Sequence, residues 1–347
     1  MAAVASLSQK SADLMTETPI SPLPAKRTKR SRRSLPSVSV VVPVFNSEQT
    51  LDELVARLDT VLAEASRAFE IILVNDGSRD GSWDVVQRLA ETHPSVGTVN
   101  LMRNYGQHNA LLAGIRRAQH EIVVTIDDDL QNPPEEIPRL LAKLADGFDV
   151  VYGVPAHEQH GFLRDLASQV TKITLQGAMG AQTARNISAF RGFRTELRQA
   201  FRDYRGSFVS VDVLLTWATT RFTALTVRHD PRAAGASNYT LRKLVIHALN
   251  MMTGFSTLPL QLASLIGFAF TLLGLLVLLF VVGRYIISGG SVPGFPFLAS
   301  IIAVFSGAQL FALGIIGEYL ARVHFRMMDK PAYAVRDDTT TAVVLHE

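Results

Sequence analysis

Two long stretches without a charged residue constrain the fold of this chain most. Residues 251–283 and 285–317 contain no Asp, Glu, Lys or Arg, and only Arg284 separates them. A helix needs about 20 apolar residues to cross the core of a bilayer. We therefore expect two membrane spans, at residues 260–282 and 297–317, separated by the glycines and prolines of residues 289–296. A hairpin buried in the core of a soluble protein is the alternative interpretation.

The charges that flank these stretches predict an orientation. Basic residues stand at both outer ends of the pair, namely Arg242, Lys243, Arg322, Arg326 and Lys330. Cytoplasmic segments next to membrane spans carry an excess of Lys and Arg, so both outer flanks and both termini are expected in the cytoplasm. Residues 241–256 mix apolar and basic positions, which fits either an amphipathic helix on the membrane surface or an ordinary core helix.

A basic N-terminal segment accounts for the positive net charge. The net charge is +3, and six Lys and Arg residues lie within residues 26–33, so the rest of the chain carries −3. A body that binds nucleic acid would itself be basic, and no nucleic-acid partner is predicted. Residues 1–35 are expected to be a disordered tail, either a solvated arm or a segment attracted to anionic lipids. The absence of cysteine excludes disulfides and thiolate metal sites.

Between residues 36 and 155, β-branched runs alternate with segments of helical periodicity. Strands are predicted at 37–44, 70–74, 95–100 and 121–126, and helices at 51–65, 83–90 and 109–118. This alternation is typical of a parallel, doubly wound sheet, in which ligands bind beyond the carboxyl ends of the strands. Asp76 and the run Asp127, Asp128 and Asp129 fall at that edge.

The acidic run predicts a cation site. Adjacent carboxylates are costly unless a cation neutralises them. Asp127 and Asp129 lie on the same side of an extended chain, and with the amide oxygen of Gln131 they offer the oxygen ligands that Mg²⁺ and Mn²⁺ prefer. The alternative interpretation of this run is an acidic turn. The alternative interpretation of Asp76 is a simple turn residue.

Several segments also carry a family resemblance. VVPVFNSEQTL, ILVNDGSRDGS, LMRNYGQHNALLAGI and TIDDDLQNPPEEIP resemble family 2 glycosyltransferases of the GT-A fold. With GEYLARV after the second span, they resemble the polyprenyl-phosphate glycosyltransferases, which include dolichol-phosphate mannose synthases and bactoprenol glucosyltransferases. NYGQH and DLQNPPEEIP are most similar to undecaprenyl-phosphate 4-deoxy-4-formamido-L-arabinose transferases. The resemblance covers residues 37–330 and implies a GT-A catalytic domain with a mostly parallel sheet at 36–240, a two-helix transmembrane hairpin at 257–322 and a cytoplasmic tail at 323–347.

The resemblance implies an enzyme that moves a sugar from a UDP- or GDP-type nucleotide sugar to polyprenyl phosphate, of the undecaprenyl type. The reaction would take place at the cytoplasmic face of a bacterial inner membrane and serve cell-envelope glycan or lipid modification. Mg²⁺ or Mn²⁺ would stabilise the leaving diphosphate as a Lewis acid. A non-catalytic membrane scaffold and a processive polysaccharide synthase are the alternatives, and a homo-oligomer stays open.

The resemblance also assigns roles to individual residues. The residues expected to bind the donor are Pro43, Phe45, Asp76, Arg103, Gly106, Gln107, Asp127 and Asp128. Those expected to hold the metal are Asp127, Asp129 and Gln131. The acceptor phosphate is assigned to Arg164, Ser168 and Arg191, and the catalytic residues are Asp129 and Arg164.

This sequence departs from the family pattern in several places. Ser47 stands where the family usually has Glu, and Asn75 where it usually has Asp, both near the expected nucleobase pocket. An arginine usual after the strand ending at Val151 is missing, an acidic residue usual before Ser188 is absent, and Asn238 replaces the lysine of a Ser-Lys-Tyr motif. The nucleotide and the sugar therefore stay open.

Overall fold

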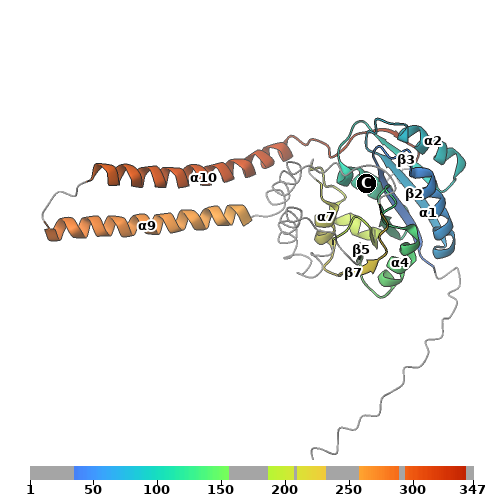
Figure 1. The fold of residues 1–347 in the computed structure, drawn as a ribbon, viewed down its shortest axis with the longest axis horizontal. Coiled ribbons are helices and arrows are strands. Elements are labelled where there is room, and N and C mark those ends of the chain that lie inside the picture. The colour runs from blue at the N-terminus through green and yellow to red at the C-terminus, as the bar shows by residue number, and fades with distance from the viewer. Residues whose placement is uncertain (1–34, 156–186, 207–208, 232–257, 289–293, 341–347) are drawn as a thin grey trace, which may run out of the picture. The chain divides into compact units, whose positions relative to one another are not determined.

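The structure is a computed structural model that describes residues 35–155, 187–206, 209–231, 258–288 and 294–340. The predictions made for the N-terminal tail up to residue 34, for residues 241–256, and for Arg164 and Ser168 lie outside these ranges. Within them the chain forms an α/β domain and two long helices, α9 and α10 (Figure 1).

The elements have the following bounds. The strands are β1 (Ser37–Val44), β2 (Ala68–Asn75), β3 (Val96–Leu101), β4 (Ile122–Thr125), β5 (Val150–Pro155), β6 (Arg191–Arg194), β7 (Phe222–Val227) and β8 (Val335–Asp338). The helices are α1 (Leu51–Ala65), α2 (Ser82–Thr92), α3 (Gln107–Arg117), α4 (Ile137–Ala145), α7 (Val211–Ala218), α9 (Leu258–Ser288) and α10 (Phe295–Met327). Short 3₁₀ segments span Pro134–Glu136 and Thr195–Phe201.

The described strands form one sheet in the order β7-β5-β6-β4-β1-β2-β3-β8. β1 pairs in parallel with β2 and β4, β2 with β3, and β5 with β7. β6 runs antiparallel between β4 and β5, and β8 is antiparallel to β3. The chain winds away from β1 in both directions, so a topological switch point lies between β1 and β4. Open α/β sheets bind their ligands at such a point, and the mostly parallel GT-A-like sheet expected from the sequence is confirmed.

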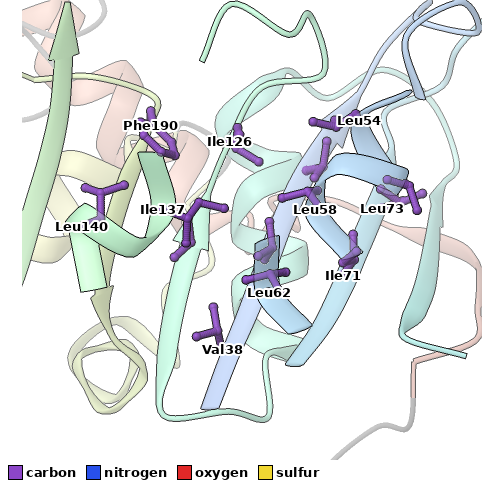
Figure 2. Packing of buried hydrophobic residues seen from close by; sticks show 14 of the residues in the cluster. Val38, Leu54, Leu58, Leu62, Ile71, Leu73, Ile126, Ile137, Leu140 and Phe190 are labelled. Atoms are coloured by element: carbon purple, nitrogen blue, oxygen red, sulfur yellow. The ribbon is translucent and has the colours of Figure 1, made fainter. Parts of the chain in front are cut away.

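The first half of the sheet follows directly from its apolar pattern. Every residue of β1 is buried, as expected for a parallel strand covered on both faces. On one face, Leu54, Leu58 and Leu62 of α1 pack with Ile71 and Leu73 of β2 in a continuous cluster (Figure 2). Truncation of one such leucine to alanine costs about 2–5 kcal/mol, so this layer provides a rigid base for the loops above it.

Helix α3 covers the opposite face at close range. Gly114 faces β1, and a Cβ at this position would lie 2.4 Å from a methyl group of Val41. No side chain larger than hydrogen fits there without a shift of the helix. The close packing fixes the height of the α3 N-terminus, where Gln107 begins the helix.

Helices α9 and α10 lie against each other and expose apolar side chains. Phe270 and Phe305 meet edge to face with ring centroids 5.7 Å apart. The windows Leu260–Arg284 and Val304–His324 have mean hydropathies of 2.9 and 1.4, and neither is buried within the protein. The interpretation as a hairpin inside a soluble core is therefore wrong. Both helices are long and apolar enough to cross a membrane, although the second window begins later than the predicted span.

After α10 the chain returns to the sheet. β8 pairs with the edge strand β3, Asp338 forms an ion pair with Arg117, and the Thr98 N–H donates to Thr339 Oγ1 at 2.9 Å. The sequence alone predicts a C-terminal tail here and no strand. Its sequence VRDD lacks an apolar pattern, and its strand structure instead depends on the open edge of β3 and on Arg117.

Candidate functional site

The switch point brings together loops from four parts of the chain. The loops follow β1, β2, β3 and β4, and all of them leave the carboxyl edge of parallel strands. The predicted donor residues Phe45, Asp76, Gln107 and Asp127 lie on these loops or at their ends. Hydrogen bonds between the loops hold them in one arrangement.

Asp127 is the first residue of the acidic run after β4 and is half-buried. Its Oδ1 accepts a hydrogen bond of 2.6 Å from Gln107 Nε2 of α3. Burial, followed by the charges of Asp129 and Asp128, raises the pKa of Asp127 to about 7, although Arg191 and Gln107 act in the opposite direction. A cation bound beside these carboxylates would oppose this shift and favour the ionised form of Asp127.

Asp128 fastens the loop that follows β1. Its Oδ2 accepts hydrogen bonds from the Phe45 N–H at 3.1 Å and from the Ser47 hydroxyl at 2.5 Å. Its carbonyl oxygen accepts another from the Thr50 hydroxyl at 2.6 Å. Burial raises the pKa of Asp128, and the Ser47 hydrogen bond opposes the shift. Asp128 therefore positions the loop, while its predicted contact with the donor stays a prediction.

This arrangement gives a physical role to one of the departures from the family pattern. Ser47 donates a hydrogen bond to Asp128, which an ionised glutamate at the same position would be unable to do. The next loop is also tied in, because the Asn46 N–H donates to Ser78 Oγ at 3.1 Å. Phe45 projects beyond the strand with 41% of its surface exposed, whereas Pro43 is buried within β1.

Asp76 positions the loop between β3 and α3. Its two carboxylate oxygens accept hydrogen bonds from the N–H groups of Tyr105 at 2.7 Å and Gly106 at 2.8 Å. Asp76 is buried, and burial raises its pKa to about 6 against these two hydrogen bonds and the charge of Arg103. Gln107 follows Gly106, so Asp76 indirectly places the amide that contacts Asp127. Its predicted contact with the nucleoside stays a prediction.

Two further features shape the same loops. Gly77 has a φ of +67°, and a Cβ there would lie 2.5 Å from the Asn104 nitrogen, so the loops of β2 and β3 approach each other only because this residue is glycine. The guanidinium of Arg103 lies 4.5 Å from the centroid of the Tyr105 ring. Arg103 is exposed beside the loop, where it is available to a ligand.

Arg191 lies beneath the site. It is 1% exposed, forms an ion pair with Asp212 of α7, and donates from Nε to Thr125 Oγ1 at 3.1 Å. The Tyr152 hydroxyl donates to the same Asp212 at 2.9 Å. Asp212 and Tyr152 are not predictable as partners of Arg191 from the sequence, because they lie in a helix and a strand outside any motif. The contact of Arg191 with an acceptor phosphate stays a prediction, and the structure places the side chain within the protein.

The remaining metal candidates lie on a tight turn. Asp129 Oδ1 accepts a hydrogen bond from the Gln131 N–H at 3.1 Å, and Leu130 between them has a φ of 60°. The described residues contain no group of three His, Cys, Asp or Glu side chains arranged to hold a metal ion. In sites that bind phosphates, Mg²⁺ usually keeps several waters and takes further oxygens from the substrate.

Three comparisons place the chain among known proteins. The model of glycosyl transferase family 2 matches residues 39–203. The undecaprenyl-phosphate 4-deoxy-4-formamido-L-arabinose transferase of Pseudomonas aeruginosa (strain LESB58) is 36% identical over 301 residues, covering 86% of this chain and 89% of the relative. The protein of the same name from Serratia proteamaculans (strain 568) is 35% identical over 302 residues, covering 86% and 93%.

Among solved structures, the chain is similar to glucosyl-3-phosphoglycerate synthase from Mycobacterium tuberculosis in complex with Mn²⁺, UDP and phosphoglyceric acid. The TM-score is 0.47 at 19% identity, and the alignment covers 64% of this chain and 78% of that chain.

Proposed function

Because the chain belongs to glycosyl transferase family 2 and is a glycosyltransferase, we propose that it moves a sugar from a nucleotide-sugar donor to polyprenyl phosphate. The undecaprenyl form is the acceptor named for its relatives from Pseudomonas and Serratia. The product would be a lipid-linked monosaccharide used to modify the cell envelope.

The observation that carries the proposal is the position of the acidic run at the switch point. Phe45 follows β1 and Asp127 follows β4 at the same edge of the sheet, and Asp128 accepts a hydrogen bond from the Phe45 N–H. An exposed aromatic ring suits a nucleobase, and the neighbouring carboxylates suit the cation that accompanies a diphosphate. The donor would therefore lie with its base toward Phe45 and its diphosphate toward Asp127 and Asp129.

A divalent cation fits the residues present. The donor set consists of carboxylate and amide oxygens, which are the ligands that Mg²⁺ and Mn²⁺ prefer. We assign Mg²⁺ or Mn²⁺ to Asp127, Asp129 and Gln131. When bound, such an ion acts as a Lewis acid on the leaving diphosphate. The chain's own contribution is to hold these oxygens in place, through Gln107 for Asp127 and through the Gln131 N–H for Asp129.

The acceptor needs positioning rather than activation. A phosphate monoester carries at least one negative charge at neutral pH, so its oxygen is a nucleophile without a strong general base. Guanidinium groups match the geometry of phosphate oxygens, and Arg164 and Ser168 are the proposed contacts. Arg191 is held in a buried ion pair with Asp212, and its assigned contact with the acceptor phosphate stays a prediction. The two apolar helices would keep the enzyme at the bilayer that holds the prenyl chain.

The orientation in the membrane is part of the same proposal. Basic residues outnumber acidic ones on the outer flanks of the two spans, and Arg322 and Lys330 follow the second span. The segment between the spans carries one charged residue, Arg284, at the end of the first span. By the positive-inside rule, the catalytic domain and both termini would face the cytoplasm, where nucleotide sugars are made.

A donor screen tests the proposal. The full chain, purified in detergent, is given undecaprenyl phosphate, Mg²⁺ or Mn²⁺ and a panel of UDP-, GDP- and dTDP-sugars that includes the 4-deoxy-4-formamido-L-arabinose donor. The expected result is a lipid product heavier by one sugar, which disappears with EDTA. Products carrying several sugars would indicate a processive synthase. The absence of product and of nucleotide binding with every donor would contradict the proposal and favour a non-catalytic scaffold.

A further inference from the structure

An aromatic pair with one exposed ring lies at the C-terminal end of α7. The first five residues of this helix are buried, whereas Trp217 near its end is 49% exposed. Its ring packs edge to face against Tyr204, with centroids 5.6 Å apart. Single exposed apolar side chains are common on soluble proteins. Exposure alone therefore does not indicate an interaction site, and the position of the pair in the fold has to be considered.

The pair lies close to the place where the chain leaves α10. Arg205, next to Tyr204, pairs with Asp329 at 3.1 Å. Helix α10 ends at Met327, two residues before Asp329, and two residues extend by at most about 7 Å. The aromatic pair is thus connected through a single ion pair to the end of a helix that is suited to cross a membrane.

A second contact fastens the same region. Arg116 of α3 donates to the Tyr204 carbonyl oxygen at 2.5 Å, and its guanidinium lies 5.7 Å from the ring centroid of Tyr333, which also follows α10. The backbone that carries Tyr204 is therefore fixed relative to the segment after α10 at two points. The depth of the segment after α10 relative to a bilayer therefore constrains the depth of Tyr204.

The distance from the bilayer follows from the helix geometry. The apolar window of α10 ends at His324. Three helical residues and two further ones place Asp329 within about 12 Å of that end. The headgroup layer beyond the hydrocarbon core is about 5–8 Å thick. The region around Asp329 and Arg205 therefore lies at or just outside the lipid headgroups.

We infer that Trp217 forms an additional membrane contact of the catalytic domain, with its ring inserted among the headgroups of a phospholipid bilayer and supported from the protein side by Tyr204. Trp and Tyr are enriched at this depth because each ring has an apolar body and one polar group. Arg202 lies beside Asp203 and Arg205 pairs with Asp329, so these two arginines each have an acidic neighbour. We assign the contact to the aromatic ring, for which uncharged phosphatidylcholine is sufficient.

The tryptophan content of the chain makes this contact directly measurable. The chain has two tryptophans, and the second, Trp83, is partly buried against the cluster between α1 and the sheet. Trp83→Phe leaves Trp217 as the only emitter, and Trp217→Phe leaves Trp83 as the matched control. Each full-length variant is reconstituted into phosphatidylcholine vesicles, with or without bromine on the acyl chains near the headgroup.

We expect brominated lipid to quench most of the emission of Trp83→Phe and to leave that of Trp217→Phe unchanged. If Trp83→Phe folds poorly, the difference in emission between wild type and Trp217→Phe gives the quenching of Trp217 instead. Equal emission from Trp217 in both kinds of vesicle would overturn the inference. A blue-shifted emission without quenching would overturn it as well, because the ring would then be buried against protein and not against lipid. High salt should leave the quenching unchanged.

The readout is independent of the proposed enzymatic function. Flotation of each variant with the vesicles reports on the two spans, and quenching reports on Trp217. A chain that transfers no sugar but shows quenching supports the inference and contradicts only the proposed activity. A chain that fails to float contradicts the inference together with the membrane part of the proposed function.

Discussion

The two halves of the sheet use charged residues in opposite ways. In the parallel half, from β4 through β1 and β2 to β3, the strands are mostly apolar and the carboxylates of the candidate site lie on loops beyond their ends. In the mixed half, β6 between β4 and β5 carries Arg191, which is buried with Asp212. The carboxylates of the first half are therefore positioned to bind a ligand, whereas the charged pair of the second half is buried within the protein. Substitutions in the first half should therefore affect activity, and those in the second should affect stability.

Asp129→Ala should have the largest effect and leave the fold intact. A bound metal ion supplies several kcal/mol of charge stabilisation to a transition state, so its loss lowers the transfer rate at least about a hundredfold. The measurement is transfer to undecaprenyl phosphate by the purified variant, with its thermal unfolding as a fold check. Asp146→Ala, an exposed aspartate just after α4, is the matched control. Full activity of Asp129→Ala would remove this residue from the site.

Arg191→Met should reduce the free energy of unfolding by about 3–5 kcal/mol, because it leaves Asp212 buried without a partner. The double variant Arg191→Met/Asp212→Leu should recover most of that loss. Arg194→Met on the same strand is the control, since Arg194 is half-exposed and lies 3.5 Å from Asp149, and such surface pairs contribute less than about 1 kcal/mol. Equal losses from Arg191→Met and Arg194→Met would show that the two halves of the sheet do not differ in this way.

Asp76 should make stability depend on pH. Its pKa is raised from 3.8 to about 6 in the folded protein, mainly by burial, so the folded state retains the proton at a pH where the unfolded chain has lost it. This contribution is fully present below about pH 4 and lost as the pH rises through about 6, a change of about 3 kcal/mol.

The free energy of unfolding of the wild type, measured relative to Asp76→Asn, should therefore fall between pH 4 and pH 7. Denaturant unfolding at several pH values measures it. Asp84→Asn, at an exposed position of α2, corrects for the loss of one charge. Parallel pH profiles for wild type and Asp76→Asn would contradict the assignment.

Ser47→Ala should have the smallest effect. It removes one of the hydrogen bonds by which Asp128 holds the Phe45 loop. A hydrogen bond to a charged group contributes about 1.5 kcal/mol, so the KM for the donor should rise about tenfold while kcat changes little. Ser47→Thr keeps the hydroxyl and should restore the KM. An unchanged donor KM in Ser47→Ala would mean that the loop is held without this contact.

The fold was predictable where the pattern of apolar residues is local. β1 and α1 have the predicted bounds, and the other early elements differ by a few residues at their ends. β6 and β8 were not predicted, because RGFR and VRDD read as polar segments. Both strands depend on partners distant in the sequence, namely β4 and β5 for the first and β3 for the second.

The site was predictable as a set of residues but not as a set of contacts. The sequence placed Asp76 and Asp127 at one sheet edge, and the structure has them there. It did not indicate that Asp76 bonds to backbone N–H groups or that Gln107 reaches Asp127, because such contacts depend on loop conformation. The burial of Arg191 was equally hidden, since nothing local to that arginine indicates its partner Asp212.

The pairing of β8 with β3 has a consequence for biosynthesis. The strand that covers the β3 edge is encoded after both membrane helices, so a ribosome completes α9 and α10 before the sheet receives its last partner. During translation the nascent domain carries an open edge strand, which is a site for wrong pairing. Both apolar helices are thus synthesised before this last strand pairing can form, and a chain truncated before residue 335 would be released with that edge uncovered.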